Sequence, residues 1–279
     1  MSQALLDHEP LLRLVAFLVV FAAMALWERM GPRRRPRWGR RTRWTANLGL
    51  AALSTLLVRV VFPAAAVGAA AFASKQGWGV FRLADWPAPL VFVACVILLD
   101  LAVYLQHLFF HTVPVLWRLH LVHHADQDFD ITTGLRFHPL EILLSMLWKA
   151  AVVILLGAPA AAVLAFEVVL NATSVFNHGN ARVPLGLDRV LRWVVVTPDM
   201  HRVHHSVVRG ETNSNFGFNL PWWDRLLGTY RGQPAAGHGD MTIGVEQLQD
   251  GPPAGLGRLL VMPFSADPGR YPIGRGSGS

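Results

Sequence analysis

The chain alternates between long apolar segments and shorter polar stretches. A helix needs about 20 mostly apolar residues to cross a bilayer. The segments that approach or exceed this length are residues 11–27, 47–73, 88–110 and 142–176. The last is too long for one upright span, and Gly157, Ala158 and Pro159 near its middle predict a turn between two helices. The pattern therefore predicts an all-α integral-membrane bundle of about four to five transmembrane helices arranged in hairpins.

Few charges interrupt these segments. The first segment has no positively charged start and leads into an arginine cluster, so we expect a retained anchor and not a cleaved signal peptide. Arg59 and Glu167 lie in apolar surroundings, where a charged side chain is costly and usually faces the protein interior. We expect these two side chains to pair with each other or to line a cavity.

The composition supports a membrane protein. Apolar residues make up 53% of the chain and charged residues 15%, whereas soluble domains average about 25% charged residues. This excludes a disordered chain, a collagen and a secreted scaffold built on disulfides. The single cysteine, Cys95, has no partner within the chain and lies in an apolar run, so we expect a small buried residue.

The positive charge is concentrated in one place. Residues 29–43 hold eight arginines and no acid, while the remaining 17 basic and 18 acidic side chains nearly balance each other, so this segment accounts for the net charge of +7. No basic face extends over the rest of the chain, which argues against nucleic-acid binding. Positive loops beside membrane spans stay in the cytoplasm. Counting spans from this loop places residues 107–138 and 178–279 on the same cytoplasmic side, with the amino terminus facing outward.

Ten of the twelve histidines fall between positions 107 and 205. Eight form three boxes: H-x-x-x-H at His107 and His111, H-x-x-H-H at His120, His123 and His124, and a second H-x-x-H-H at His201, His204 and His205. His138 and His178 stand singly between the boxes. Positions i, i+3 and i+4 of a helix lie on one face, so each box directs its imidazoles to one side. His8 and His238 lie in polar or glycine-rich termini and are expected to have no role.

Crowded imidazoles without nearby acids are typical of metal ligation, because neutral imidazole is a strong donor to iron, copper, zinc and nickel. The sequence has no paired cysteines and no H-E-x-x-H motif, which disfavours a structural zinc site and a helix-borne zinc protease. Eight or more ligands are enough for two ions. Two other classes stay open: a membrane zinc-dependent hydrolase or lyase, and a non-catalytic metal-binding membrane protein such as a transporter.

The boxes resemble those of the fatty acid hydroxylase and sterol desaturase superfamily of integral-membrane, non-haem diiron oxidoreductases. The resemblance covers about residues 95–230. It implies a diiron (Fe) cofactor and the use of O2 to hydroxylate or desaturate an unactivated C–H of a lipid such as a sterol or a fatty acyl chain. Further matching motifs are Asp100 and Tyr104, Leu116 and Trp117, residues 136–141 (RFHPLE), 197–201 (TPDMH), 215–217 (NFG) and 223–229 (WDRLLGT).

The expected metal ligands are the eight box histidines together with His178 and His138. Relatives often have two histidines four residues apart after the hairpin, but here Arg182 follows His178 at that spacing. His138 either supplies the tenth ligand or only caps the turn at residues 136–139. Asp100 lies two helical turns before His107, where its carboxylate could orient a ligating imidazole or pair with an arginine.

The sequence also predicts partners and domains. It contains no dinucleotide-binding glycine motif after a strand and no iron–sulfur cysteine set, so a separate electron donor is needed, and the arginine loop is a candidate surface for it. We expect membrane anchor helices in residues 1–94, a histidine-box catalytic domain in 95–235 with its membrane hairpin at 142–176, and a C-terminal tail in 236–279. Residues 263–279, rich in Gly, Ser and Pro, are expected to pack loosely.

Overall fold

The computed structural model describes residues 8–273, and this part of the chain is built from helices with two isolated bridges and no strand. The predicted all-α class is confirmed. The α-helices are α2 (Glu9–Met30), α3 (Arg40–Val61), α4 (Ala65–Gln76), α5 (Ala88–Thr112), α6 (Pro114–His124), α7 (Pro139–Leu156), α8 (Ala160–Asn177), α9 (Leu185–Leu191), α10 (Pro198–His204), α11 (Arg209–Thr212), α12 (Trp222–Leu226), α13 (Gly237–Asp240) and α14 (Leu256–Ser265).

Five helical stretches are long and apolar enough to cross a membrane: α2, the run from α3 to Arg82, α5, α7 and α8. The chain is therefore a multi-pass membrane protein, as predicted. Helix α7 ends at Gly157, whose φ of +66° favours glycine, and a Cβ there would lie 2.7 Å from the carbonyl oxygen of Trp78. Pro159 then precedes α8. The predicted turn between two helices in residues 142–176 is confirmed by α7 and α8.

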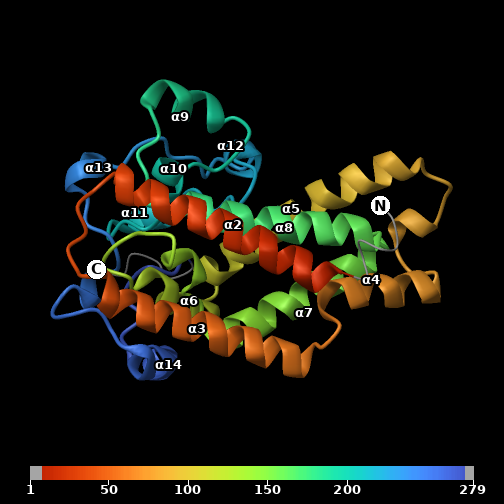
Figure 1. Cartoon of the computed structure of the whole chain (residues 1–279), viewed down its shortest axis with the longest axis horizontal. Helices are drawn as coiled ribbons and strands as arrows, with labels where there is room; N and C mark the ends of the chain where they lie inside the picture. The colour runs from red at the N-terminus through yellow and green to blue at the C-terminus, as the bar shows by residue number, and fades with distance from the viewer. Residues whose placement is uncertain (1–7, 274–279) are drawn as a thin grey trace.

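The long helices run side by side along the longest axis of the molecule (Figure 1). Helix α2 packs on α8, α3 packs on α7, and α5 contacts both α7 and α8. The short helices α6 and α9–α14 gather at one end of the bundle, and we call this end the cap (Figure 1). The segment between α2 and α3 lies at the same end, where Arg33 pairs with Asp199. The arginine-rich segment and the cap thus share one side of the bundle, as the span count predicted.

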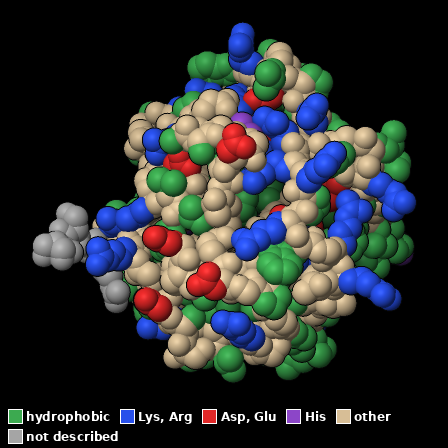
Figure 2. Space-filling view, turned by 90° about the vertical axis from the view of Figure 1, so that its left-hand side faces the viewer, with side chains coloured by type: hydrophobic (Ala, Val, Ile, Leu, Met, Phe, Trp, Pro, Cys, Tyr) green, Lys and Arg blue, Asp and Glu red, His purple; other side chains and the backbone are tan. Residues whose placement is uncertain are grey.

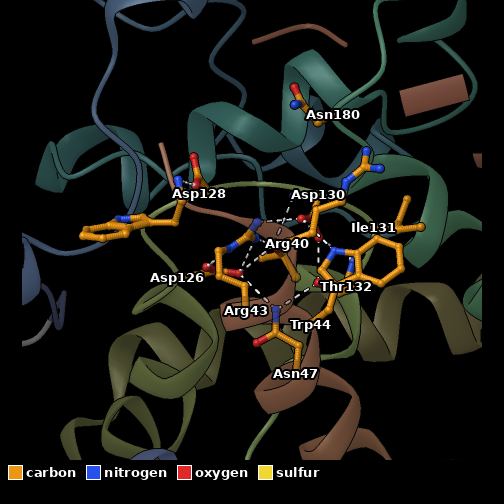
Figure 3. Close-up of polar contacts among 12 residues, drawn as sticks. Arg40, Arg43, Trp44, Asn47, Asp126, Asp128, Asp130, Ile131, Thr132 and Asn180 are labelled. Atoms are coloured by element: carbon orange, nitrogen blue, oxygen red, sulfur yellow. Dashed lines mark hydrogen bonds and ion pairs between the residues drawn. The ribbon is translucent and has the colours of Figure 1, made fainter. Parts of the chain in front are cut away.

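Part of the arginine-rich segment holds the cap in place. Arg43, in the first turn of α3, is 1% exposed and donates two 2.7 Å hydrogen bonds to Asp126. Its third nitrogen contacts Asp130 at 2.5 Å (Figure 3). Burial alone would raise the pKa of Asp126, but the charges of Arg43 and Arg136 outweigh it and lower that pKa below its usual range. Some of these arginines are therefore structural, in addition to marking topology.

Replacing Arg43 by alanine is expected to destabilise the protein by about 3–5 kcal/mol, because it leaves two buried carboxylates without their cation. The matched control is Arg41→Ala, since Arg41 is exposed and close in sequence. Thermal unfolding of the purified protein in a nonionic detergent measures the stability of both variants. Equal midpoints for the two variants would contradict the structural role of Arg43.

The C-terminal residues are packed more closely than predicted. Helix α14 contacts α6 and α3. The ring of Tyr271 stacks on Trp117 at 5.5 Å, and the amide of Ile273 donates to the carbonyl oxygen of His111 at 3.0 Å. The expectation of a loose end at residues 263–279 is corrected for residues 263–273 by these contacts. Residues 274–279 lie outside the described part of the chain.

Candidate metal centre

Nine buried histidines form two groups, and within each group the ligand nitrogens lie within 4.8 Å of one another. The first cluster contains His107 and His111 of α5, His120 and His124 of α6, and His204 of α10. The second cluster contains His123 of α6, His178 after α8, and His201 and His205 at α10. Helices distant in sequence therefore bring the three boxes and His178 together. No cysteine or carboxylate belongs to either cluster among the described residues.

Each H-x-x-H-H box is shared between the clusters. In α6, His120 and His124 face the first cluster and His123 faces the second. The box at α10 is divided in the opposite way: His204 joins the first cluster, while His201 and His205 join the second. The ring centroids of His124 and His205 are 4.7 Å apart, so the two clusters adjoin. One pair of boxes can thus serve two neighbouring ions.

Hydrogen bonds to one ring nitrogen fix where the lone pair of the other points. His107 and His204 donate from Nδ1 to the carbonyl oxygens of Phe216 and Ser214, at 2.8 and 2.7 Å. His178 donates in the same way to Ser174, at 2.8 Å. A carbonyl oxygen only accepts, so Nδ1 of each neutral ring carries the hydrogen and Nε2 presents a lone pair. These carbonyls orient the rings as ligands are oriented in metal sites.

The lone pairs converge on one another. The Nε2 atoms of His107 and His120 are 3.1 Å apart, and Nε2 of His178 lies 3.0 Å from that of His201. Two nitrogens bound about 2.1 Å from one ion at right angles would be about 3.0 Å apart. In His107 and His120, where Nδ1 donates to an acceptor, both Nε2 atoms present lone pairs, which repel unless a cation lies between them. The residues present therefore fit metal ions.

Several other buried ring nitrogens have no hydrogen-bond partner in residues 8–273. They include Nε2 of His111, Nε2 of His204 and both ring nitrogens of His124 and His205. Leaving a buried polar atom unpaired costs about 1–3 kcal/mol, and so many in one place need an explanation. Burial lowers the pKa of His120 and of His178 to about 3, so both rings are neutral near pH 7. Neutral, unpaired imidazole nitrogens are ready to bind metal.

His138 lies outside both clusters. Its Nδ1 accepts a 3.2 Å hydrogen bond from the amide of Leu140, and its Nε2 donates at 3.1 Å to the carbonyl oxygen of Leu260. Both ring nitrogens are therefore used, and the side chain caps the N-terminus of α7. The sequence left two roles open for His138. In the structure it is the N-cap residue of α7 and is not among the nine grouped histidines.

Asp100 is buried on α5, and within residues 8–273 it forms no hydrogen bond or ion pair with a histidine. Its Oδ2 accepts hydrogen bonds from the indole nitrogen of Trp223 at 2.8 Å and from the amide of Leu220 at 3.3 Å. The expectation that it orients an imidazole is corrected by these contacts. It instead fixes the segment that follows Phe216 and Phe218, whose rings border His107.

The carboxylate that contacts a grouped histidine is that of Glu141. Its Oε1 lies 2.6 Å from Nδ1 of His120 and accepts a hydrogen bond from it. Glu141 is 3% exposed, in the first turn of α7. In the sequence, Glu141 is distinguished only as the last residue of the matching motif at 136–141. An acid at the start of an apolar segment was the available signal, because such an acid needs a partner.

The remaining two histidines have different environments. His8 is exposed at the start of α2. His238 is buried, with Nε2 3.7 Å from Oδ2 of Asp199, and belongs to neither cluster.

A cavity of about 420 Å3 extends from the first cluster into the helix bundle. His107 and His120 lie at its inner end, together with Glu141. Its walls come from α2, α3, α5, α7 and α8 and are mostly apolar, with Phe110 and Met146 among the lining residues. Mostly apolar cavities of this size are typical of small-molecule sites. This one can hold part of a hydrocarbon chain beside the histidines.

Comparisons with known proteins agree with this site. The profile described as fatty acid hydroxylase matches residues 92–229. An ornithine lipid hydroxylase of Rhizobium tropici, OlsE, is 31% identical over 238 residues, which are 82% of this chain and 70% of the relative. An alkylglycerol monooxygenase of Xenopus tropicalis is 30% identical over 158 residues, 55% of this chain and 34% of the relative. Human cholesterol 25-hydroxylase is 30% identical over 142 residues, 49% of this chain and 50% of the relative. No solved structure matches the chain significantly.

Fold and site together define a multi-pass membrane protein with buried imidazoles grouped for metal binding. The chain belongs to the fatty acid hydroxylase family. The resemblance seen in the sequence is confirmed. The match spans 34% of the amphibian monooxygenase and 50% of the human hydroxylase.

Proposed function

We propose that the chain is a membrane-bound oxidoreductase that uses O2 and two iron ions to hydroxylate a C–H bond of a lipid. The observation that carries this proposal is the pair of adjoining all-histidine clusters, of which the first lies at the inner end of a mostly apolar cavity. The names of the relatives, two hydroxylases and a monooxygenase, support hydroxylation over desaturation. They also support a lipid as the substrate.

The first cluster would hold one ion and the second cluster the other, with five and four imidazoles available. Bound iron would supply the activation of dioxygen and the oxidation of the C–H bond. Nine donors offer four or five imidazoles to each of two ions, which is more than the three protein ligands of catalytic zinc sites. Imidazole also suits iron, which unlike zinc has redox chemistry.

The protein groups position the ligands and the substrate. Glu141 and the carbonyl oxygens of Phe216, Ser214 and Ser174 fix the rings that they contact. The cavity walls hold the hydrocarbon next to His107 and His120 and keep water from the reacting carbon. A rigid, dry site of this kind directs oxidation to one position of a chain.

The reaction needs electrons from elsewhere. Inserting one oxygen atom of O2 into C–H, with the other atom leaving as water, consumes two electrons and two protons. A separate donor protein is proposed to supply the electrons at the cap, on the cytoplasmic side of the membrane. Arginine side chains are spread over the face at the cap end (Figure 2), and Arg35, Arg37 and Arg41 are exposed. An acidic donor would be attracted to this surface.

The proposal is tested with purified, iron-loaded protein, a chemical reductant and lipids extracted from the native membrane. Under 18O2 we expect a lipid product heavier by one 18O atom, measured by mass spectrometry, and no product without oxygen. Product formed at the same rate in the absence of O2, or a preparation active with zinc alone, would instead indicate a hydrolase or lyase.

A further inference from the structure

The outer end of the cavity carries charges that oxygen chemistry does not need. Arg13, Arg59 and Lys149 line it from α2, α3 and α7, together with the carboxylates of Glu9 and Glu167. Both Arg13 and Arg59 come from the ends of α2 and α3 that lie away from the cap (Figure 1). Charges among membrane helices are costly and usually mark a functional site.

One of the three cations at this end of the cavity, Arg59, takes no part in the ion pairs there. Arg13 contacts Glu9 and Glu167 at 2.5 Å each, and Nζ of Lys149 lies 2.7 Å from Glu167. Within residues 8–273, Arg59 forms no hydrogen bond or ion pair. Three cations thus face two carboxylates, with the unpaired guanidinium at the exposed end of the cavity. The excess positive charge suits an acidic group.

The two ends of the cavity are separated by the length of a hydrocarbon segment. On α7, Lys149 follows Glu141 by eight residues, and on α8 Glu167 precedes Ser174 by seven. At 1.5 Å per residue, the charged end lies about 10–12 Å along the helices from the histidine end. An extended chain advances about 1.2 Å per bond, so this is about ten bonds.

We propose that the substrate is a lipid with an acidic headgroup, a carboxylate or a phosphate, held by Arg59 and its neighbours while its acyl chain extends to His107 and His120. Oxidation then falls on the chain, about ten bonds from the acidic group, and not on the headgroup. This inference rests on the proposed function for its oxidation step. Recognition of the acidic group does not, since it involves neither iron nor O2.

Binding of amphiphiles with one chain length isolates this recognition. The full-length protein in dodecyl maltoside is titrated with palmitate, hexadecyl phosphate, hexadecanol and hexadecyltrimethylammonium. We expect one or both anions to bind at least about tenfold more tightly than the alcohol, as a charge-assisted hydrogen bond requires. Which of the two binds better identifies a carboxylate or a phosphate headgroup. Equal affinity for the alcohol, or preference for the ammonium, would overturn the proposal.

The variant that tests the residue is Arg59→Gln, because the exposed, unpaired Arg59 is not needed for folding. We expect the preference for anions to fall about tenfold and the thermal midpoint to stay unchanged. Arg29→Gln is the matched control, since Arg29 is exposed on α2 and does not line the cavity. Unaltered anion affinity in Arg59→Gln would contradict the assignment.

The position of the new hydroxyl provides the second readout. Tandem mass spectrometry of the oxidised lipid is expected to place it on the acyl chain, about ten bonds from the acidic group. A hydroxyl on the headgroup would overturn the proposed orientation even if the anions bind. Absence of any product with normal anion binding would instead count against the proposed oxygenase function, so the two failures are distinguishable.

Discussion

The His178→Ala variant is expected to lose lipid oxidation by at least about 100-fold and to bind less than about one iron ion per chain. His178 lies alone in the sequence, but its Nε2 is 3.2 Å from that of His123 and 3.0 Å from that of His201. Removing its ring leaves the second cluster with three imidazoles. Loss of one ligand lowers both the affinity for the metal and the order of the site.

The matched control is His138→Asn, because an asparagine still caps a helix. Iron content and product formation of this variant are expected to equal those of the unmodified protein. Iron is measured by plasma emission spectrometry and product by lipid mass spectrometry. Iron loss in His138→Asn comparable to that in His178→Ala would show that the nine grouped histidines are not the complete ligand set.

The Glu141→Gln variant is expected to bind iron about 10–100-fold more weakly, with an activity loss in the same range. Glutamine keeps an oxygen that accepts from Nδ1 of His120, but it lacks the charge that increases the basicity of that ring. Glu141→Leu removes the acceptor as well, so its iron affinity and activity are expected to fall below those of Glu141→Gln. Competition with a metal chelator, followed through the iron absorbance, measures the affinity.

Asp100→Ala provides the contrast for Glu141. Because Asp100 accepts from Trp223 and Leu220, its removal leaves two partly buried donors without this acceptor and is expected to cost about 1–3 kcal/mol of stability. The affinity for iron is expected to be unchanged. A chelator titration that shifts in Asp100→Ala as much as in Glu141→Gln would mean that Asp100 also acts on the metal centre.

The membrane-spanning helices could be predicted because burial in lipid is recorded locally in the sequence. Runs of apolar residues and the break at Gly157 and Pro159 are visible without any partner, and the helices α7 and α8 follow them. The side of the arginine-rich segment follows from counting those runs. That Arg43 is buried against Asp126 could not be predicted in this way, since the contact joins residues 83 positions apart.

The histidine boxes identified the type of site but not its arrangement. Helix periodicity places His120, His123 and His124 on one side of α6, within an arc that two neighbouring clusters can share. Which ring joins which cluster depends on how α5, α6, α8 and α10 meet. The same holds for Glu141, whose partner His120 lies 21 residues away.

The sequence by itself determined the all-helical membrane architecture, the common side of the boxes and the arginine-rich segment, and the imidazole chemistry of the site. These features follow from hydrophobicity, charge and helical spacing, which act over a few residues. Tertiary structure decided the division into two clusters, the capping of helix α7 by His138, the orienting role of Glu141 and the cavity ending at Arg59. Each of these depends on side chains from separate helices meeting in space, and local spacing carries no information about which helices meet.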